Sequence, residues 1–294
     1  MDIVICAIAR FENRYVKEWV DYHLALGFSH IYIYDNNREG EERIAAVLGD
    51  NPSHVTIIPF HNVNTWPQIL AYEDCWKNKA FDWVLFCDLD EFFTFGSKWA
   101  KNRNISTFVE EYKDKTDAIL LNWMMFGDNG ELDYEDRPVI ERFPNPLPLK
   151  FSESNLLGKQ PANGHVKTLV KHVADFTPTG PHVGSGKYRC INAEGTVVDN
   201  KAWQPDQTYE MAYIRHYVTK TISEYMDCKM KREKADRKPG VFYKKSTFFV
   251  YNKPTFSKIL RYKKAVRESA GMEKEPLLWW IKQFIKHYIV APFL

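Results

Sequence analysis

The sequence lacks the signatures of several common nucleotide-binding proteins. It has no Gly-x-Gly-x-x-Gly segment after its first predicted strand and no Gly-x-x-x-x-Gly-Lys-Ser/Thr segment anywhere. Their absence argues against a dinucleotide-binding Rossmann enzyme and a P-loop NTPase. The formal net charge is only +2, so the sequence implies no field that would attract nucleic acid. Residues 1–5 carry no basic region and no long apolar segment, so we expect no signal peptide.

Cysteine is scarce and dispersed along the chain. None of the five cysteines forms a Cys-x-x-Cys pair, and we expect them to be reduced thiols of a cytoplasmic protein. Apolar residues make up 45% of the 294 positions, which is enough for the core of one large α/β domain, with or without an appendage.

An acidic cluster follows a short apolar run near residue 85. The run from Val84 to Cys87 predicts a strand buried on both faces, and three carboxylates follow within four residues: Asp88, Asp90 and Glu91. Buried strands rarely end in negative charge unless something positive lies there. Ligands of open α/β sheets bind beyond the carboxyl ends of the strands, so these carboxylates mark a candidate ligand site.

The Asp-x-Asp spacing is compatible with a divalent metal. On a regular strand, two such carboxylates lie roughly 6.6 Å apart along the axis, too far for one ion with bonds of about 2.1 Å. Either the strand bends at its end, or one aspartate binds the metal while the other acts through water or holds the substrate. Oxygen ligands favour Mg²⁺ or Mn²⁺, which usually also hold a substrate diphosphate. The alternative is an acidic loop without a ligand.

The first 87 residues predict alternating strands and helices. The expected strands are 2–9, 31–34, 55–60 and 84–87, and the expected helices are 14–26, 41–48 and 69–79. This alternation predicts a mostly parallel sheet with right-handed crossovers. Farther along we expect a helix at 104–112, with Ser106 a candidate cap, a strand at 118–126, a long Pro-rich loop at 131–165, strands at 166–172 and 211–217, and a helix at 223–234.

The C-terminal stretch is basic and apolar. Residues 277–294 place apolar side chains at helical spacing, and residues 253–267 add six Lys or Arg. Such a helix is compatible with a membrane interface, or with packing against the domain or a second subunit. Residues 253–294 are thus a candidate for contact with a membrane surface.

An ordered series of short motifs resembles GT-A glycosyltransferases of the family-2 and family-92 type. The series is Arg10-x-Glu12-Asn13, Glu18-Trp19-Val20-x-Tyr22-His23, Ile33-Tyr34-Asp35-Asn36, Gln68-x-x-x-Tyr72, Asp88-Leu89-Asp90-Glu91-Phe92, Lys167, His182 and His216-Tyr217-x-x-Lys220. The resemblance covers roughly residues 1–235. It implies a GT-A fold with a nucleotide-sugar half at 1–95 and an acceptor half at 96–235, followed by a helical extension at 236–294.

The resemblance also implies roles for individual residues. Asp90 would bind Mn²⁺ or Mg²⁺, Asp88 would contact ribose or complete the metal shell, and His216, or alternatively His182, would join the metal. A UDP-linked sugar would be held by the residues Ala9, Arg10, Glu12, Asp35, Asn37, Gln68, Asp88 and Lys167. Lys171, Arg215 and Lys220 are further candidates to neutralise the diphosphate.

Transfer with inversion also needs a general base on the acceptor side. Asp128, at the end of the strand expected at 118–126, is the first candidate, and Glu131 and Asp133 are the next.

The sequence therefore predicts a metal-dependent, inverting hexosyltransferase of the EC 2.4 class. It would act on a glycan or lipid-linked acceptor in surface polysaccharide or lipopolysaccharide synthesis. Its expected location is the cytoplasm, at the inner face of the plasma membrane, as a monomer or an oligomer. Two alternatives share the site: a nucleotidyltransferase, and a glycan-binding protein without turnover.

Overall fold

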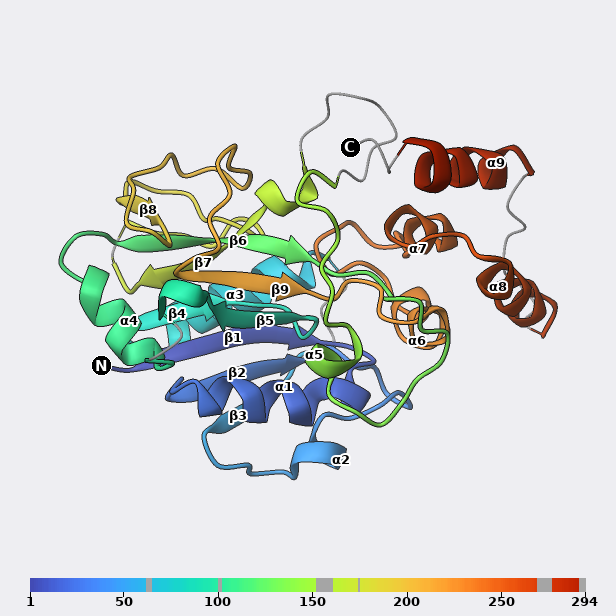
Figure 1. The fold of residues 1–294 in the computed structure, drawn as a ribbon. Helices are drawn as coiled ribbons and strands as arrows, with labels where there is room; N and C mark the ends of the chain where they lie inside the picture. Colours follow the sequence, from blue (N-terminus) through green and yellow to red (C-terminus); the bar gives the residue numbers. More distant parts are fainter. Residues whose placement is uncertain (62–64, 100–101, 152–160, 174, 269–276, 291–294) are drawn as a thin grey trace. The chain divides into compact units, whose positions relative to one another are not determined.

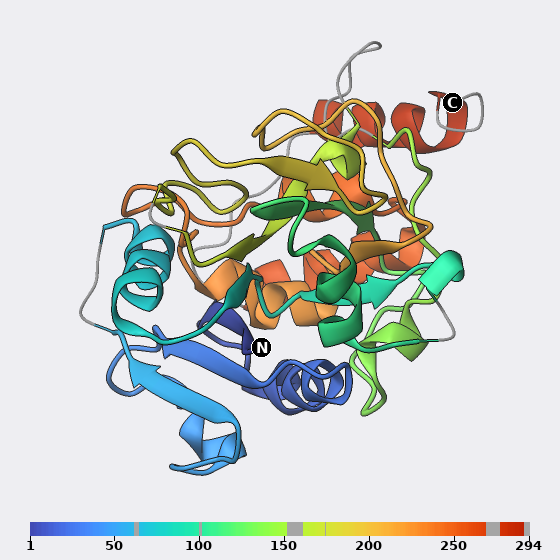
Figure 2. The same cartoon turned by 90° about the vertical axis from the view of Figure 1, so that its left-hand side faces the viewer.

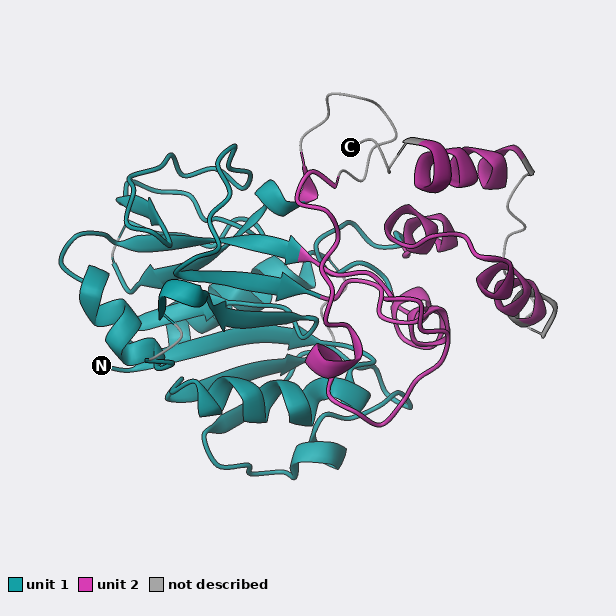
Figure 3. Ribbon diagram, viewed as in Figure 1, with its two compact units in different colours: residues 1–124, 163–216, 233–241 teal, residues 125–162, 217–232, 242–294 magenta. Residues whose placement is uncertain are grey.

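The structure is a computed structural model that describes residues 1–61, 65–99, 102–151, 161–173, 175–268 and 277–290. The chain forms two compact units, shown in teal and magenta in Figure 3. Unit 1 contains residues 1–124, 163–216 and 233–241, and unit 2 contains residues 125–162, 217–232 and 242–294. Each unit is built from three separate stretches of the chain. The domain boundaries expected after residues 95 and 235 stay predictions.

Half of the sheet in unit 1 is parallel. Strands β1 (Ile3–Ala9), β2 (His30–Asp35), β3 (Val55–Pro59) and β4 (Trp83–Phe86) pair in the order β3-β2-β1-β4. All three pairs are parallel. Their carboxyl ends therefore meet at one edge, as the sequence predicts, and the acidic cluster follows β4 at that edge (Figure 1).

The other half of the sheet is largely antiparallel. Strand β7 (Val166–Lys171) pairs antiparallel with both β4 and β6 (Ala118–Met125), and β5 (Glu91–Phe95) pairs antiparallel with β9 (Ala212–His216). The short strand β8 (Cys190–Asn192) joins β6 in parallel. The sheet is thus mixed, and the expected parallel pairing describes only its first half.

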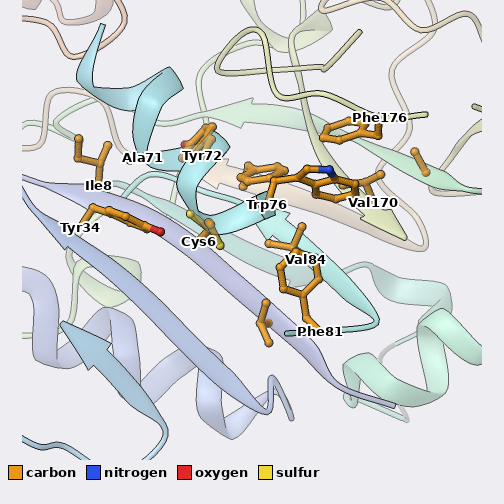
Figure 4. Close-up of a cluster of buried hydrophobic side chains, with 14 of the residues drawn as sticks. Cys6, Ile8, Tyr34, Ala71, Tyr72, Trp76, Phe81, Val84, Val170 and Phe176 are labelled. Atoms are coloured by element: carbon orange, nitrogen blue, oxygen red, sulfur yellow. The ribbon is translucent and has the colours of Figure 1, made fainter. Parts of the chain in front are cut away.

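Helices cover both faces of the first strands. Alternate residues of β1 and β4, such as Val4, Cys6 and Val84, pack with α3 (Pro67–Asn78) in one apolar cluster (Figure 4). Helix α1 (Asn13–Ala25) lies on the opposite side of β1 and β2 (Figure 2). It begins directly after the β1 loop and is followed by Gly27, whose φ of 91° is suited to glycine. The loop after β1 is therefore fixed between a buried strand and a buried helix.

Unit 2 is helical. It contains α5 (Val139–Arg142), α6 (Ile222–Asp227), α7 (Lys245–Tyr251), α8 (Phe256–Glu268) and α9 (Leu277–Ile285), followed by a π-helical turn, η4 (Lys286–Val290). Its core is aromatic, with Tyr225, Phe248, Phe249 and Tyr262 buried together. Among the described helices, none is both long and apolar enough to cross a membrane.

Several local predictions were wrong. The helix expected at 41–48 is only α2 (Ala45–Leu48), and the helix expected at 223–234 ends at Asp227. Strand β5 was not predicted. The cap of α4 (Ile105–Tyr112) is Asn104, whose side chain accepts the N–H of Ser106, so Ser106 is not the cap. Part of the long loop expected at 131–165 lies outside the described residues, which do include the short helix α5.

Candidate functional site

The chain turns sharply between β4 and β5, and the turn carries the acidic cluster. The Glu91 N–H donates to the Asp88 carbonyl at 3.0 Å, which closes the turn over Asp88, Leu89 and Asp90. The aspartates are therefore not on a regular strand. The expected bend at the end of the strand is observed, and the division of roles between the two aspartates stays a prediction.

The positive charge that such a cluster needs is Lys167. Its ammonium lies 2.9 Å from the Asp88 carboxylate and 3.1 Å from the Glu91 carboxylate. Strand register explains the placement: β7 pairs Leu169 with Leu85, so two residues farther along Lys167 comes opposite Cys87, beside the turn. Lys167 and Glu91 are fully buried, whereas the Asp88 side chain is 30% exposed and within reach of a ligand.

Burial and charge act against each other in this pair. Burial alone would lower the pKa of Lys167, but the carboxylates of Asp88 and Glu91 raise it well above the ordinary value, so the ammonium stays charged. Burial raises the pKa of Glu91 to about 7, and the attraction of Lys167 only partly opposes that effect. Within the described residues, Glu91 Oε1 has no hydrogen-bond partner, in keeping with a carboxyl that gains a proton easily.

Helix α3 supplies the neutral side of the cluster. Gln68, in its first turn, donates from Nε2 to the Asp88 carboxylate at 2.6 Å, and the Tyr72 hydroxyl donates to the same oxygen at 3.3 Å. Asp88 thus accepts hydrogen bonds from an ammonium, an amide and a phenol. These bonds fix the orientation of its carboxylate. Gln68, Asp88 and Lys167, three of the predicted donor-binding residues, thus contact one another, and their contact with a donor stays a prediction.

Asp90 points to a different partner. Register on β5 and β9 pairs Glu91 with His216, and His216 Nε2 lies 3.6 Å from the Asp90 carboxylate. Both side chains are nearly buried, and His216 Nδ1 has no hydrogen-bond partner among the described residues. His216 packs against the Trp123 ring, with centroids 4.3 Å apart.

A divalent ion fits this pair in chemistry and number. Mg²⁺ and Mn²⁺ are usually held by one or two protein ligands, with substrate phosphates and water completing the shell. Asp90 and His216 supply two such ligands. Among the residues that the structure describes, no three His, Cys, Asp or Glu side chains lie close enough to bind a metal by themselves. Asp88, held by Lys167 and Gln68, thus does not form a three-ligand group with Asp90 and His216, and metal use stays a prediction.

The loops after β1 and β2 bind each other. The Asp35 carboxylate accepts the backbone N–H groups of Asn37 and Ile44, and Asn37 Oδ1 accepts the N–H of Phe11. Asp35 and Asn37 also line a hollow of about 920 Å³ beyond β2 and β3, a volume within the usual range for small-molecule sites. Ala9 ends β1, and Glu12, at the N-terminus of α1, is buried. Contact of these residues with a nucleoside stays a prediction.

Comparison with known proteins now decides the family. The sequence model of glycosyltransferase family 92 matches residues 2–171. The chain belongs to glycosyltransferase family 92. A family 92 protein of Ricinus communis is 32% identical over 252 residues, covering 82% of this chain and 42% of that protein. A second, from Oryza sativa subsp. japonica, is 30% identical over 177 residues, covering 57% of this chain and 29% of that protein. The chain thus spans less than half the length of these relatives.

Solved structures are more distant from this family 92 chain. S. aureus TarS 1-349 aligns with a TM-score of 0.34 and 15% identity, covering 58% of this chain and 47% of that one. HddC from Yersinia pseudotuberculosis gives a TM-score of 0.33 and 13% identity, covering 65% and 90%. Likenesses of this size carry no functional argument. The predicted α/β class is confirmed: helices flank a mixed sheet whose first four strands are parallel, and further helices follow at the C-terminus.

A segment outside the family match also contacts the strand-end edge. Residues 233–241 belong to unit 1, where Glu233 accepts from Arg38 at 2.7 Å and lies 3.9 Å from Arg10. The Ala235 carbonyl accepts the Gln68 N–H. Long-range contacts of this kind leave no local pattern in the sequence. Arg10, the predicted donor-binding cation, is neutralised mainly by Glu41 at 2.6 Å.

The candidate general base lies in unit 2. Asp128 is 4% exposed, its carboxylate lies 2.5 Å from the Lys258 ammonium, and it accepts the Gly130 N–H. Burial raises the pKa of Asp128, and Lys258 opposes the rise. The two other candidates are Glu131, whose N–H donates to the Asp128 carbonyl, and Asp133, which forms an exposed pair with Arg261.

The remaining predicted residues have varied surroundings. His182 donates from Nδ1 to the Val166 carbonyl and packs against Trp123; burial lowers its pKa to about 3, so it is neutral. Lys171 ends β7, and Arg215 lies on β9 beside His216. Lys220 is buried in unit 2 with a φ of 52°.

Proposed function

We propose that this chain transfers a hexosyl group from a nucleotide-linked sugar, with UDP as the leaving nucleotide, to a glycan or lipid-linked acceptor. The observation that carries the proposal is the Asp90–His216 pair beside the Lys167-neutralised carboxylates of Asp88 and Glu91, at the strand-end edge of a family 92 chain. A synthetic role in surface polysaccharide or lipopolysaccharide belongs to the same proposal.

Each side chain has a distinct task in this proposal. Asp90 and His216 would hold Mn²⁺ or Mg²⁺, and the bound ion would supply positive charge against the diphosphate that leaves. Asp88, fixed by Gln68, Tyr72 and Lys167, accepts hydrogen bonds from hydroxyl groups of the donor through its partly exposed carboxylate. The loops that carry Asp35 and Asn37 border the space for the nucleoside.

The acceptor hydroxyl must lose a proton if the transfer inverts the sugar carbon. Asp128 remains our candidate for this task, because burial moves its pKa upward, toward that of a base that works near neutral pH. Removal of the proton would require its carboxylate to be released from Lys258.

Calorimetric titration of UDP, with and without Mn²⁺, tests the donor site. We expect binding that depends on Mn²⁺ and is at least about tenfold weaker in Asp90→Asn, since this change removes one of two protein ligands. Asp114→Asn, an exposed site on unit 1, is the matched control and should bind as the unaltered chain does. A UDP affinity that is the same with and without Mn²⁺, and the same in Asp90→Asn, would contradict the proposal.

Measurement of UDP release from a UDP-sugar tests the transfer step separately from donor binding. We expect the unaltered chain to release UDP from a UDP-sugar, and Asp128→Asn to keep UDP affinity while this release falls by about a hundredfold or more. Pyrophosphate released from a nucleoside triphosphate would instead identify a nucleotidyltransferase. UDP affinity lost together with turnover in Asp128→Asn would contradict the base assignment.

A further inference from the structure

Helix α9 and the turn η4 expose a row of apolar side chains on the surface. Six side chains there are between 41% and 63% exposed: Leu278, Ile281, Phe284, Ile285, Tyr288 and Ile289. Their spacing of three and four residues places them on one stripe of the helix surface. The rings of Phe284 and Tyr288 stack on that stripe with centroids 4.5 Å apart.

The inner side of the same helix is fixed by polar and aromatic groups. Gln283 is 1% exposed, and His287 Nε2 lies 2.9 Å from the Phe249 carbonyl of α7. The ring centroid of Trp280 is 4.7 Å from that of Phe249. A helix of a soluble domain normally buries its apolar stripe and exposes its amides. Here contacts within unit 2 hold Gln283 and His287 inward together with Trp280 and leave the other apolar side chains exposed, so the outward apolar face is not a consequence of a loose helix.

Helix α8 of the same unit extends this pattern. Phe256 is 75% exposed and Leu260 is 49% exposed, one turn apart. Single exposed apolar residues are ordinary, but contiguous ones indicate a surface that another phase or molecule covers.

The net charge of the C-terminal residues indicates which partner covers the apolar stripe. Residues 242–294 contain eleven Lys and Arg against three Glu, a net charge of +8 in a chain whose total is +2. Lys253, Lys263, Lys264 and Lys282 are exposed. Two copies meeting face to face across a twofold axis would bring these like charges together, which opposes a dimer. An anionic lipid surface instead pairs with the cations and takes up the apolar stripe.

We infer that the stripe of α9 and η4, with the exposed end of α8 and the surrounding lysines, docks unit 2 on an anionic bilayer surface. The helix lies in the interface plane, with its apolar side chains among the upper acyl groups and its ammonium groups at lipid phosphates. This inference does not depend on the proposed sugar transfer.

Vesicle co-sedimentation of the full chain tests the inference. We expect partitioning onto phosphatidylcholine vesicles that contain phosphatidylglycerol, and much less onto phosphatidylcholine alone or in high salt. Ile281→Glu should lower the partition coefficient by about tenfold or more, and Lys282→Gln by about fivefold, because these changes place a charge in the stripe and remove a cation. Val197→Glu is the matched control, since Val197 is 82% exposed on unit 1.

Two results would overturn the inference. Equal partitioning of Ile281→Glu and Val197→Glu would show that the stripe does not touch lipid. No partitioning of the unaltered chain, with a dimer in sedimentation velocity that Ile281→Glu dissociates, would assign the stripe to a second copy. Because Ile281 and Lys282 are exposed, both variants should keep the urea midpoint of the unaltered chain, which confirms that they fold.

Discussion

Replacement of Lys167 by Met tests the charge balance at the centre of the candidate site. The ammonium is fully buried and lies within 3.1 Å of two carboxylates. Removal of one partner of a buried ion pair typically costs about 3–5 kcal/mol, because the other charge is left without compensation. Asp88 is partly hydrated, so most of the cost comes from Glu91, which has no access to water. The free energy of unfolding should fall by about 3 kcal/mol, a large share of the roughly 5–15 kcal/mol that stabilises a domain.

The cost should depend on pH in a defined direction. The native pKa of Glu91 is raised from 4.5 to about 7, so the native state binds this proton more tightly than the unfolded chain. Stability from this group is therefore greatest below pH 4.5 and is lost as pH rises through about 7. Without Lys167 the pKa of Glu91 should rise further, so Lys167→Met should lose more stability at about pH 8 than at about pH 6.

Urea unfolding followed by circular dichroism at the two pH values measures both effects. Lys171→Met, on the same strand but partly exposed, is the matched control and should cost less than about 1 kcal/mol. The double variant Lys167→Met/Glu91→Gln should recover much of the loss, because no buried charge then remains at position 91. A Lys167→Met protein as stable as the Lys171→Met control at both pH values would refute this account of the site.

Two further predictions concern the cores of the units. In unit 1, His23 is fully buried, lies 2.8 Å from the Trp19 carbonyl through Nδ1 and accepts the Phe93 N–H through Nε2. Its pKa is lowered to about 3 by burial, so it is neutral in the native state; stability should fall as pH drops below 6.5, and less so in His23→Gln, as thermal unfolding would show. In unit 2, Arg142→Met should cost about 3–5 kcal/mol at neutral pH by stranding the buried carboxylate of Glu224, and Arg142→Met/Glu224→Gln should recover part of it in urea titrations. Equal stability of Arg142→Met and the unaltered chain would contradict the assigned pairing.

The sequence contains enough local information to predict the first half of the fold. Strands β1 to β4 and helices α1 and α3 have apolar periods that match their buried faces, and their ends fall within a few residues of the prediction. The helix expected at 41–48 was wrong because its first turn has other partners: Glu41 pairs with Arg10, and the Ile44 N–H donates to Asp35. Propensity cannot foresee such long-range bonds.

The second half depends on information that lies outside any local window. Strand β5 was not predicted because it begins at Glu91, inside the acidic cluster, and carboxylates are depleted in strands. The direction of β7 and β9 leaves no trace in periodicity, yet that direction brings Lys167 to Glu91 and His216 to Asp90. The residue types of the site could thus be predicted, whereas their pairing required the register. Likewise, nothing in the sequence links Asp128 to Lys258, 130 positions later.

The pairing of β5 with β9 limits how this chain can be truncated for expression. The family match ends at residue 171, whereas β9 begins at Ala212. A fragment trimmed to the match would keep β5, whose five residues are all buried, but would lose the strand that pairs with its backbone. The backbone N–H and C=O groups of β5 would then be free to pair with a strand of another molecule, which leads to aggregation. The shortest useful truncation must therefore extend beyond the matched residues at least to His216.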